Sequence, residues 1–203
     1  MPQEIQYAKV DQDSLEFLKA IYFGAETNPY TAAANRAYLD MNRTIRFNGL
    51  DEKERKRLHD FVCDLLEMSI KKLEAHPPQT QGAYDLWHFE LCQYIQKAYA
   101  KSGIVFYMGQ CQKWVNMTMK YLYIIGVCGF DGYFGFLHIP LDNYIFDVSA
   151  RELGVARPDK AWSRMADYQS EYLAYEKKLR KAIGDAAPLR WEFHAWLKEA
   201  RKR

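Results

Sequence analysis

The sequence predicts an all-α fold, with residues 1–203 forming a single globular helical domain of about eight helices. Apolar residues recur at three- and four-residue spacing over most of the chain, as on one face of a helix. Hydrophobic residues make up 49% of the chain and aromatic residues 15%, so the helices can bury a substantial core. If the domain divides into two lobes, residues 1–103 and 104–203 would form them.

Prolines and glycines divide the chain into the expected helices, at residues 11–24, 28–47, 51–75, 84–103, 109–126, 141–154, 166–184 and 188–202. The clearest helix breaker is His76-Pro77-Pro78, and Gly154 is expected to end a helix. The segment 127–140 places three glycines among aromatic residues. It fits an irregular loop or a short hairpin, and it is the one segment where strand is considered.

The formal net charge of +2 is weak evidence for any partner. Nucleic-acid binding would have to rest on a local basic patch. The tail WLKEARKR (196–203) is such a patch, although terminal charge runs are commonly just solvated. The N-terminal residues do not form a basic region followed by an apolar run, and no stretch of eighteen apolar residues free of charge occurs. We therefore expect no signal peptide, no membrane span and a cytoplasmic location.

Metal and cofactor motifs give no support for a bound group. The sequence HFE (88–90) has the H-x-E spacing of zinc deaminases, but the partner P-C-x-x-C is missing. The five histidines are scattered, and no phosphate-binding or dinucleotide-binding glycine pattern occurs. We expect no metal and no cofactor, and we expect His88 to be a core or interface residue.

The four cysteines lie far apart in or beside apolar helical segments, without a CxxC pair, at positions 63, 92, 111 and 128. They are expected to be reduced core residues.

One helix combines an apolar composition with a polar stripe. In GQCQKWVNMTMKYLYIIG (109–126), the stripe consists of Gln112, Lys113, Asn116 and Lys120. Lys113 is expected near the helix start, where the helix dipole and burial both disfavour an ammonium ion. An unprotonated amine is what nucleophilic catalysis needs. The competing interpretation is that Lys113 and Lys120 extend to solvent with their aliphatic parts packed.

A carboxylate follows in HIPLDNYIFDV (138–148). Pro140 fixes the approach of the chain, and Asp142 falls where a helix begins, so its side chain can accept backbone N–H groups as an N-cap. As a plain N-cap it needs no further role.

Lys113, followed 29 residues later by Asp142 in the string IPLD (139–142), resembles the helix-hairpin-helix DNA glycosylases. The spacing is similar to that of the archaeal 8-oxoguanine DNA glycosylase branch. The resemblance covers about residues 109–148 and the overall helicity. The family's glycine-rich hairpin, whose amides hold a DNA phosphate, corresponds here to YMGQCQKW (107–114), with one glycine.

The resemblance implies a base-excision enzyme acting on double-stranded DNA that contains a damaged base such as an oxidised purine. Lys113 would form a Schiff base with the sugar, and Asp142 would stabilise developing charge or accept a proton. The extruded base would stack on Trp114 or Phe106. The remaining substrate-binding candidates are Gln112, Asn116 and Lys120. Gln112 and Asn116 would hydrogen-bond the base or brace the lysine, and Lys120 is the competing lysine.

Two other hypotheses stay open. The chain could be a non-enzymatic DNA-binding or protein-interaction module on a similar scaffold, with Lys113, Asn116 and Lys120 as a polar stripe only. It could also be a helical assembly protein that packs an aromatic face, such as YLAYEKKLRKAIG (172–184), against a partner.

Overall fold

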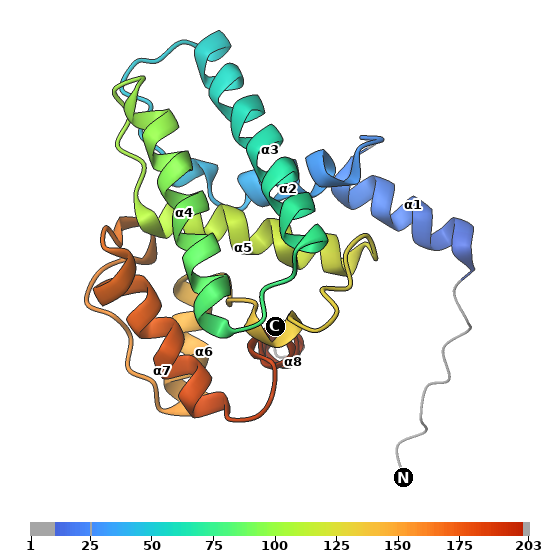
Figure 1. Ribbon diagram of the computed structural model, residues 1–203, viewed down its shortest axis with the longest axis vertical. Coiled ribbons are helices and arrows are strands. Elements are labelled where there is room, and N and C mark those ends of the chain that lie inside the picture. The colour runs from blue at the N-terminus through green and yellow to red at the C-terminus, as the bar shows by residue number, and fades with distance from the viewer. Residues whose placement is uncertain (1–10, 25, 201–203) are drawn as a thin grey trace.

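The computed structural model describes residues 11–24 and 26–200, with side chains up to residue 198, and this part of the chain contains eight α-helices and no strand (Figure 1). The predicted all-α class is confirmed. The helices are α1 (Gln12–Phe23), α2 (Pro29–Leu39), α3 (Glu52–Ala75), α4 (Gln81–Ala100), α5 (Met108–Ile124), α6 (Asn143–Leu153), α7 (Ala174–Ile183) and α8 (Pro188–Ala200). None of the described helices is long and apolar enough to cross a membrane.

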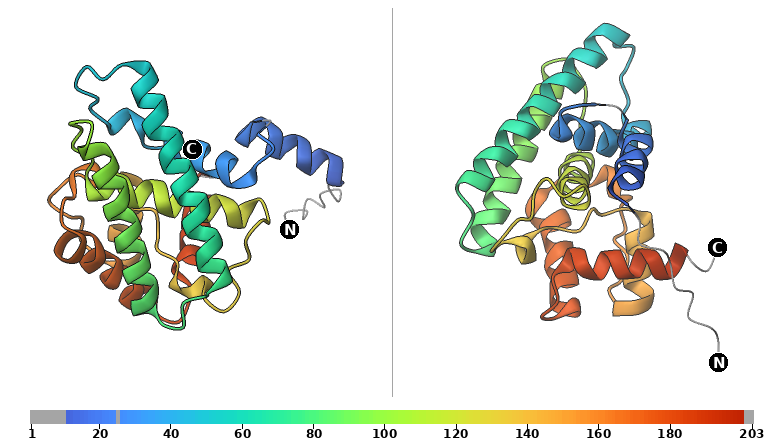
Figure 2. Two further views of the ribbon diagram at one scale, coloured as in Figure 1. Left: turned by 45° about the horizontal axis from the view of Figure 1, so that its top comes forward. Right: turned by 90° about the vertical axis from the view of Figure 1, so that its right-hand side faces the viewer.

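Helix α5 is the axis of the molecule. Fourteen of its seventeen residues are buried, because α1–α4 lie on one side of it and α6–α8 on the other (Figure 2, right). Four buried alanines of α2 let that helix approach α5 closely, at positions 32, 33, 34 and 37. One hydrophobic core surrounds α5 and extends from Ala33 to Leu189. The four cysteines are free and buried, as predicted.

The start of α5 lies directly against the turn at residues 162–165. The Gly109 amide donates to the Met165 carbonyl at 3.0 Å. A Cβ atom at position 109 would lie 1.6 Å from the carbonyl oxygen of Trp162, which is backbone. Only glycine fits this approach.

Three sequence expectations need correction. The helix expected over 28–47 ends at Leu39, and a 3-10 turn, η1 (Asn42–Thr44), follows. The chain then becomes extended at the β-branched Ile45 and turns through residues with positive φ, Asn48 and Gly49. The helix expected over 166–184 begins as a π-helical turn, η4 (Tyr168–Leu173). The helix over 84–103 begins three residues earlier, since Thr80 caps it.

The other boundaries follow the sequence more closely. The segment 127–140 is an irregular loop with one 3-10 turn, η2 (Phe134–Phe136), so the hairpin option is wrong. Gly154 ends α6 in the left-handed conformation, with φ +66°. Residues 201–203 of the basic tail lie outside the described residues.

Helix α1 forms as expected but contributes no buried residue. Its apolar side chains are exposed, at positions 15, 17, 18, 21 and 22. Contact with the body comes from its C-terminal end, where the hydroxyls of Tyr22 and Tyr121 lie 3.1 Å apart. The ring of Phe23 also meets Tyr121 edge-on.

We expect Gly109→Ala to lower the free energy of unfolding by about 2–3 kcal/mol, because backbone atoms must move to admit the methyl group. The melting temperature would fall by roughly 4–12 °C for a chain of this size. The matched control is Gly82→Ala in α4, where an added Cβ meets no atom within 4 Å. Equal melting temperatures for the two variants would contradict the close approach.

Candidate functional site

Lys113 and Asp142 meet, although 29 residues separate them along the chain. The Lys113 ammonium donates to Asp142 Oδ2 at 2.6 Å and lies 3.5 Å from the Pro140 carbonyl. The other carboxylate oxygen, Oδ1, accepts the Ile145 amide at 2.9 Å, so Asp142 is also the N-cap of α6. The lysine side chain is 7% exposed and the aspartate side chain 29% exposed. The pair therefore lies at the edge of the core, with its carboxylate side turned toward solvent.

The backbone just before Asp142 is held in place by an amide clamp formed by Gln112. Its Nε2 donates to the Leu141 carbonyl at 2.9 Å, and its Oε1 accepts the Leu141 amide at 3.1 Å. The backbone amide and carbonyl of Leu141 thereby both have hydrogen-bond partners inside the core. Because Gln112 precedes Lys113 in α5, one turn of helix binds both Leu141 and Asp142.

Asn116, one turn further along α5, joins this clamp to a buried network. Its Nδ2 lies within hydrogen-bond distance of Gln112 Oε1, the Ile139 carbonyl and the Tyr172 hydroxyl, at 3.1, 3.3 and 2.9 Å. Its Oδ1 is 3.0 Å from His88 Nε2. Gln112 and Asn116, predicted as substrate contacts, thus bind the chain's own backbone and side chains.

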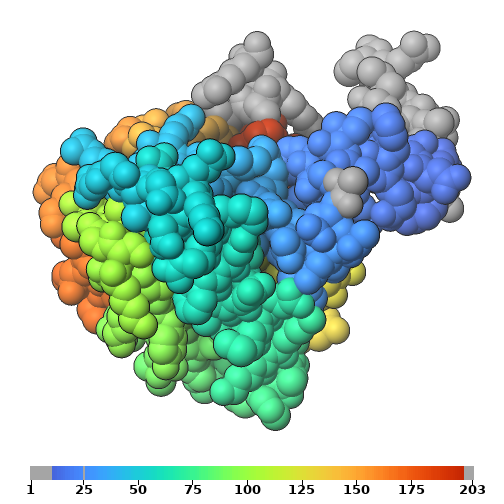
Figure 3. All heavy atoms as spheres, turned by 90° about the horizontal axis from the view of Figure 1, so that it is seen from above, coloured from blue at the N-terminus to red at the C-terminus, as the bar shows by residue number. Residues whose placement is uncertain are grey.

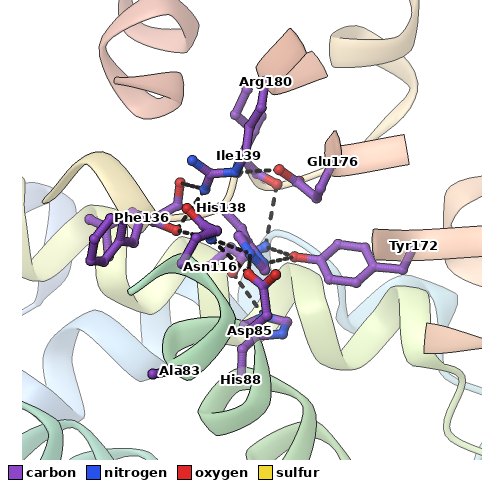
Figure 4. Close-up of polar contacts among 12 residues, drawn as sticks. Ala83, Asp85, His88, Asn116, Phe136, His138, Ile139, Tyr172, Glu176 and Arg180 are labelled. Carbon is purple, nitrogen blue, oxygen red and sulfur yellow. Dashed lines mark hydrogen bonds and ion pairs between the residues drawn. The ribbon is translucent and has the colours of Figure 1, made fainter. Parts of the chain in front are cut away.

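The side chain of His138, at the start of the 138–141 segment, connects α4 with η4 (Figure 4). His138 Nε2 is 2.8 Å from Asp85 Oδ1 of α4, and Nδ1 is 2.8 Å from the Tyr172 hydroxyl of η4. Burial lowers the pKa of His138 and outweighs the opposing hydrogen bond to Asp85. Burial acts to raise the pKa of Asp85, but the hydrogen bond from His138 lowers it overall. The pair is therefore a carboxylate beside a neutral imidazole.

Glu176 of α7 is completely buried beside Ile139 (Figure 4). Its Oε2 lies 3.4 Å from the Ile139 amide, and its Oε1 has no partner within the described chain. Desolvation raises the pKa of Glu176 from 4.5 to about 8, although the nearby Arg180 opposes the rise. Arg180 itself donates to three loop carbonyls, those of Gly135, Phe136 and Leu137. The loop that delivers Asp142 is thus fixed from both α5 and α7.

The start of α5 is closed to ligands at three of its first amides. Gly109 donates to Met165, and the amides of Gln110 and Cys111 donate to the Tyr107 carbonyl at 3.0 and 3.1 Å. The Gln110 side chain accepts the Tyr107 amide and donates to Thr44. These amides are not available to hold a phosphate.

Lys120 does not reach Asp142, and two further predicted contacts lie in the core. The Lys120 ammonium pairs with Glu192 of α8 at 2.7 Å. Trp114 is fully buried, and its indole donates to the Ala34 carbonyl at 2.9 Å. Phe106 is buried and stacked on Tyr99, with ring centroids 4.2 Å apart. Of the two candidate lysines, Lys113 alone contacts Asp142.

Two surface hollows of the described chain lie elsewhere. One, of about 410 Å³, is lined by α1, α2 and the end of α5. The other, of about 500 Å³, lies between α2 and α3 and includes His59 and Cys63. Neither Lys113 nor Asp142 lines either hollow.

The sequence interpretation missed His138, Asp85 and Glu176 as parts of the site. His138 lies in the quoted string HIPLD, and Glu176 lies four residues after Tyr172, on the tyrosine face of its helix. That spacing is a signal for burial of Glu176. Asp85 carries no such signal, because the fold alone brings it to His138.

Comparison with protein-family models, curated proteins and solved structures gives no match for this chain.

We expect the buried Glu176 to make stability depend on pH. Between pH 4.5 and about 8, the unfolded chain loses this proton while the folded protein keeps it. The contribution of this group to the free energy of unfolding is therefore fully present below pH 4.5 and falls as pH rises to about 8. In urea titrations across this range, Glu176→Gln should gain stability relative to the wild type as pH rises.

The control is Glu171→Gln. The hydrogen bond from Lys160 lowers the pKa of Glu171, so this variant should lose stability relative to the wild type only as pH rises to 4.5, and its profile should run parallel to that of the wild type between pH 4.5 and 8. Parallel pH profiles for the wild type and Glu176→Gln would refute the buried-acid assignment.

Proposed function

We propose that the protein is a base-excision DNA glycosylase acting on duplex DNA with a damaged base such as an oxidised purine, with Schiff-base lyase activity at Lys113. One observation carries the proposal. The amine and the carboxylate expected to perform this chemistry lie 2.6 Å apart. The resemblance of residues 109–148 to the helix-hairpin-helix glycosylases supplies the substrate class.

The contact provides the proton transfer that the reaction needs. Lys113 passes a proton to Asp142 Oδ2, and the free amine attacks the sugar carbon that bears the base. As the new C–N bond forms, the glycosidic bond breaks and its electron pair leaves with the base, which takes up the proton that Asp142 received from Lys113. Opening of the sugar ring gives the Schiff base, from which elimination of the 3′ phosphate can follow.

The N-cap position of Asp142 suits this role. Its Oδ1 is fixed by the Ile145 amide, so Oδ2 is the oxygen that exchanges the proton. The helix N-terminus stabilises negative charge on this carboxylate, which suits its second role, the stabilisation of positive charge that develops on the sugar. The Gln112 clamp holds the carboxylate and amine in register, which is the positioning that an oriented nucleophile requires.

The competing function is a non-enzymatic helical module that binds DNA or protein. Two observations favour it: Lys113 is 7% exposed, and neither it nor Asp142 lines either of the two hollows described above. In that case the same contact is a structural ion pair. The two functions are distinguished by whether Lys113 forms a Schiff base with DNA.

Incubation with duplexes carrying single defined lesions, followed by borohydride, should trap a covalent protein–DNA adduct, because reduction converts the Schiff base into a stable amine. Lys113→Ala should abolish trapping, and mass spectrometry of the wild-type adduct should locate the link at residue 113. Trapping by Lys113→Ala at the wild-type level would reject the assignment.

Asp142→Asn tests the carboxylate with the cap retained, since asparagine also caps helices well. We expect excision to slow by roughly 100-fold or more with a melting temperature close to that of the wild type. Lys120→Ala is the control lysine variant. It should keep trapping activity in the folded fraction, because Lys120 pairs with Glu192 and not with Asp142.

A further inference from the structure

Three segments distant in sequence meet at the start of α5. Gln110 donates to Thr44 at 2.8 Å, which ties the segment 41–50 to this end. Gln96 of α4 donates to the Phe106 carbonyl at 2.9 Å. From the 161–166 segment, the Arg164 guanidinium lies 4.9 Å from the ring centre of Tyr107. Figure 3 looks onto this end and shows the cyan, yellow-green and orange segments together.

These segments carry positive charge only. Lys113, Lys120 and Lys160 are paired with acids of other segments. The remaining cations are Arg43, Arg46, Lys97, Lys101 and Arg164, which we call the cationic end. Residues 41–50, 91–130 and 160–166 contain no aspartate or glutamate. Glu171 accepts the Ala166 amide at the edge of these segments, where it is paired with Lys160.

The cations of this end are available to a partner. Arg43, Arg46, Lys97 and Lys101 are exposed. Within the described part of the chain, none of the five forms an ion pair. Unpaired like charges gathered on one end repel one another, and a polyanion relieves that repulsion.

The position of this end relative to Lys113 indicates which polyanion it binds. Lys113 is five residues from the first residue of α5, which is about 7.5 Å along the helix axis. A duplex held at the cationic end would therefore lie against the same end of α5 that carries Lys113. The first amides of α5 are already bonded within the protein, so side chains must make the phosphate contacts.

We propose that the cationic end binds the phosphate backbone of duplex DNA. The identity of the partner rests on the proposed function. The binding mode is carried by the convergence of three acid-free segments around residues 106–110.

The test measures binding of an undamaged, fluorescently labelled duplex by anisotropy, from about 50 to 200 mM salt. The test variant combines Arg43→Gln, Lys97→Gln and Lys101→Gln. If each cation contacts a phosphate, the slope of log affinity against log salt becomes shallower by about 3. We also expect the dissociation constant to rise at least about tenfold.

The matched control removes the same charge from α7, on the other side of α5 (Figure 1), with Lys177→Gln, Lys178→Gln and Lys181→Gln. It should bind within about twofold of the wild type, since these lysines lie off the contact surface. All substituted side chains are exposed, so unfolding is not expected, and circular dichroism checks this.

The proposal is overturned if both triple variants bind alike, or if the wild type does not bind the duplex at the lowest salt. Tighter binding of a single-stranded RNA of equal length would assign the surface to RNA and overturn it too. The assay involves no chemistry at Lys113. Binding without Schiff-base trapping would therefore reject the proposed function alone, and trapping with unchanged binding by the test variant would reject the cationic end alone.

Discussion

The hydrogen bonds from Gln112 and Asn116 to the 139–141 backbone are the constraint on which the site depends. A loop that passes beside a buried helix brings amides and carbonyls into the core, and each of them needs a partner. Helix α5 provides those partners from two side chains one turn apart. The polar stripe of an otherwise apolar helix is thereby explained, because half of the stripe binds the loop and the other half forms ion pairs with Asp142 and Glu192.

A second set of polar groups supports the loop from below. His138, Asp85 and Tyr172 form a chain of hydrogen bonds between α4 and η4, and Arg180 holds three successive carbonyls. Buried polar networks add little net stability, but a misplaced loop would leave several groups without partners. The network therefore specifies one position for the loop, and with it the position of Asp142.

The sequence predicted the parts of the structure that depend on local chemistry. Helical periodicity identified the class, Asp142 was recognised as an N-cap, and Gly154 ended its helix. The end of α2 at Leu39 was missed, since helical spacing continues past it and the break depends on packing of the following turn. The roles of Gln112, Trp114 and Phe106 were not visible either. The sequence alone does not distinguish a polar or aromatic residue that binds a ligand from one that packs against another part of the chain.

The pairing of Lys113 with Asp142 depends on the fold. The sequence indicated it because the separation of Lys113 from the IPLD string resembles that in the helix-hairpin-helix glycosylases. His138 and Glu176 became part of the site only in three dimensions. Asp85 illustrates the limit, since no periodicity or neighbouring residue relates it to a histidine 53 positions away.

Helix α1 lies outside the core and is attached mainly through Tyr22 and Phe23. Opening it uncovers little apolar area that water does not already reach, so its local unfolding costs far less than global unfolding. Amide hydrogens of α1 should consequently exchange with solvent long before those of α5. A protease should cut first within this helix and leave the seven-helix body folded.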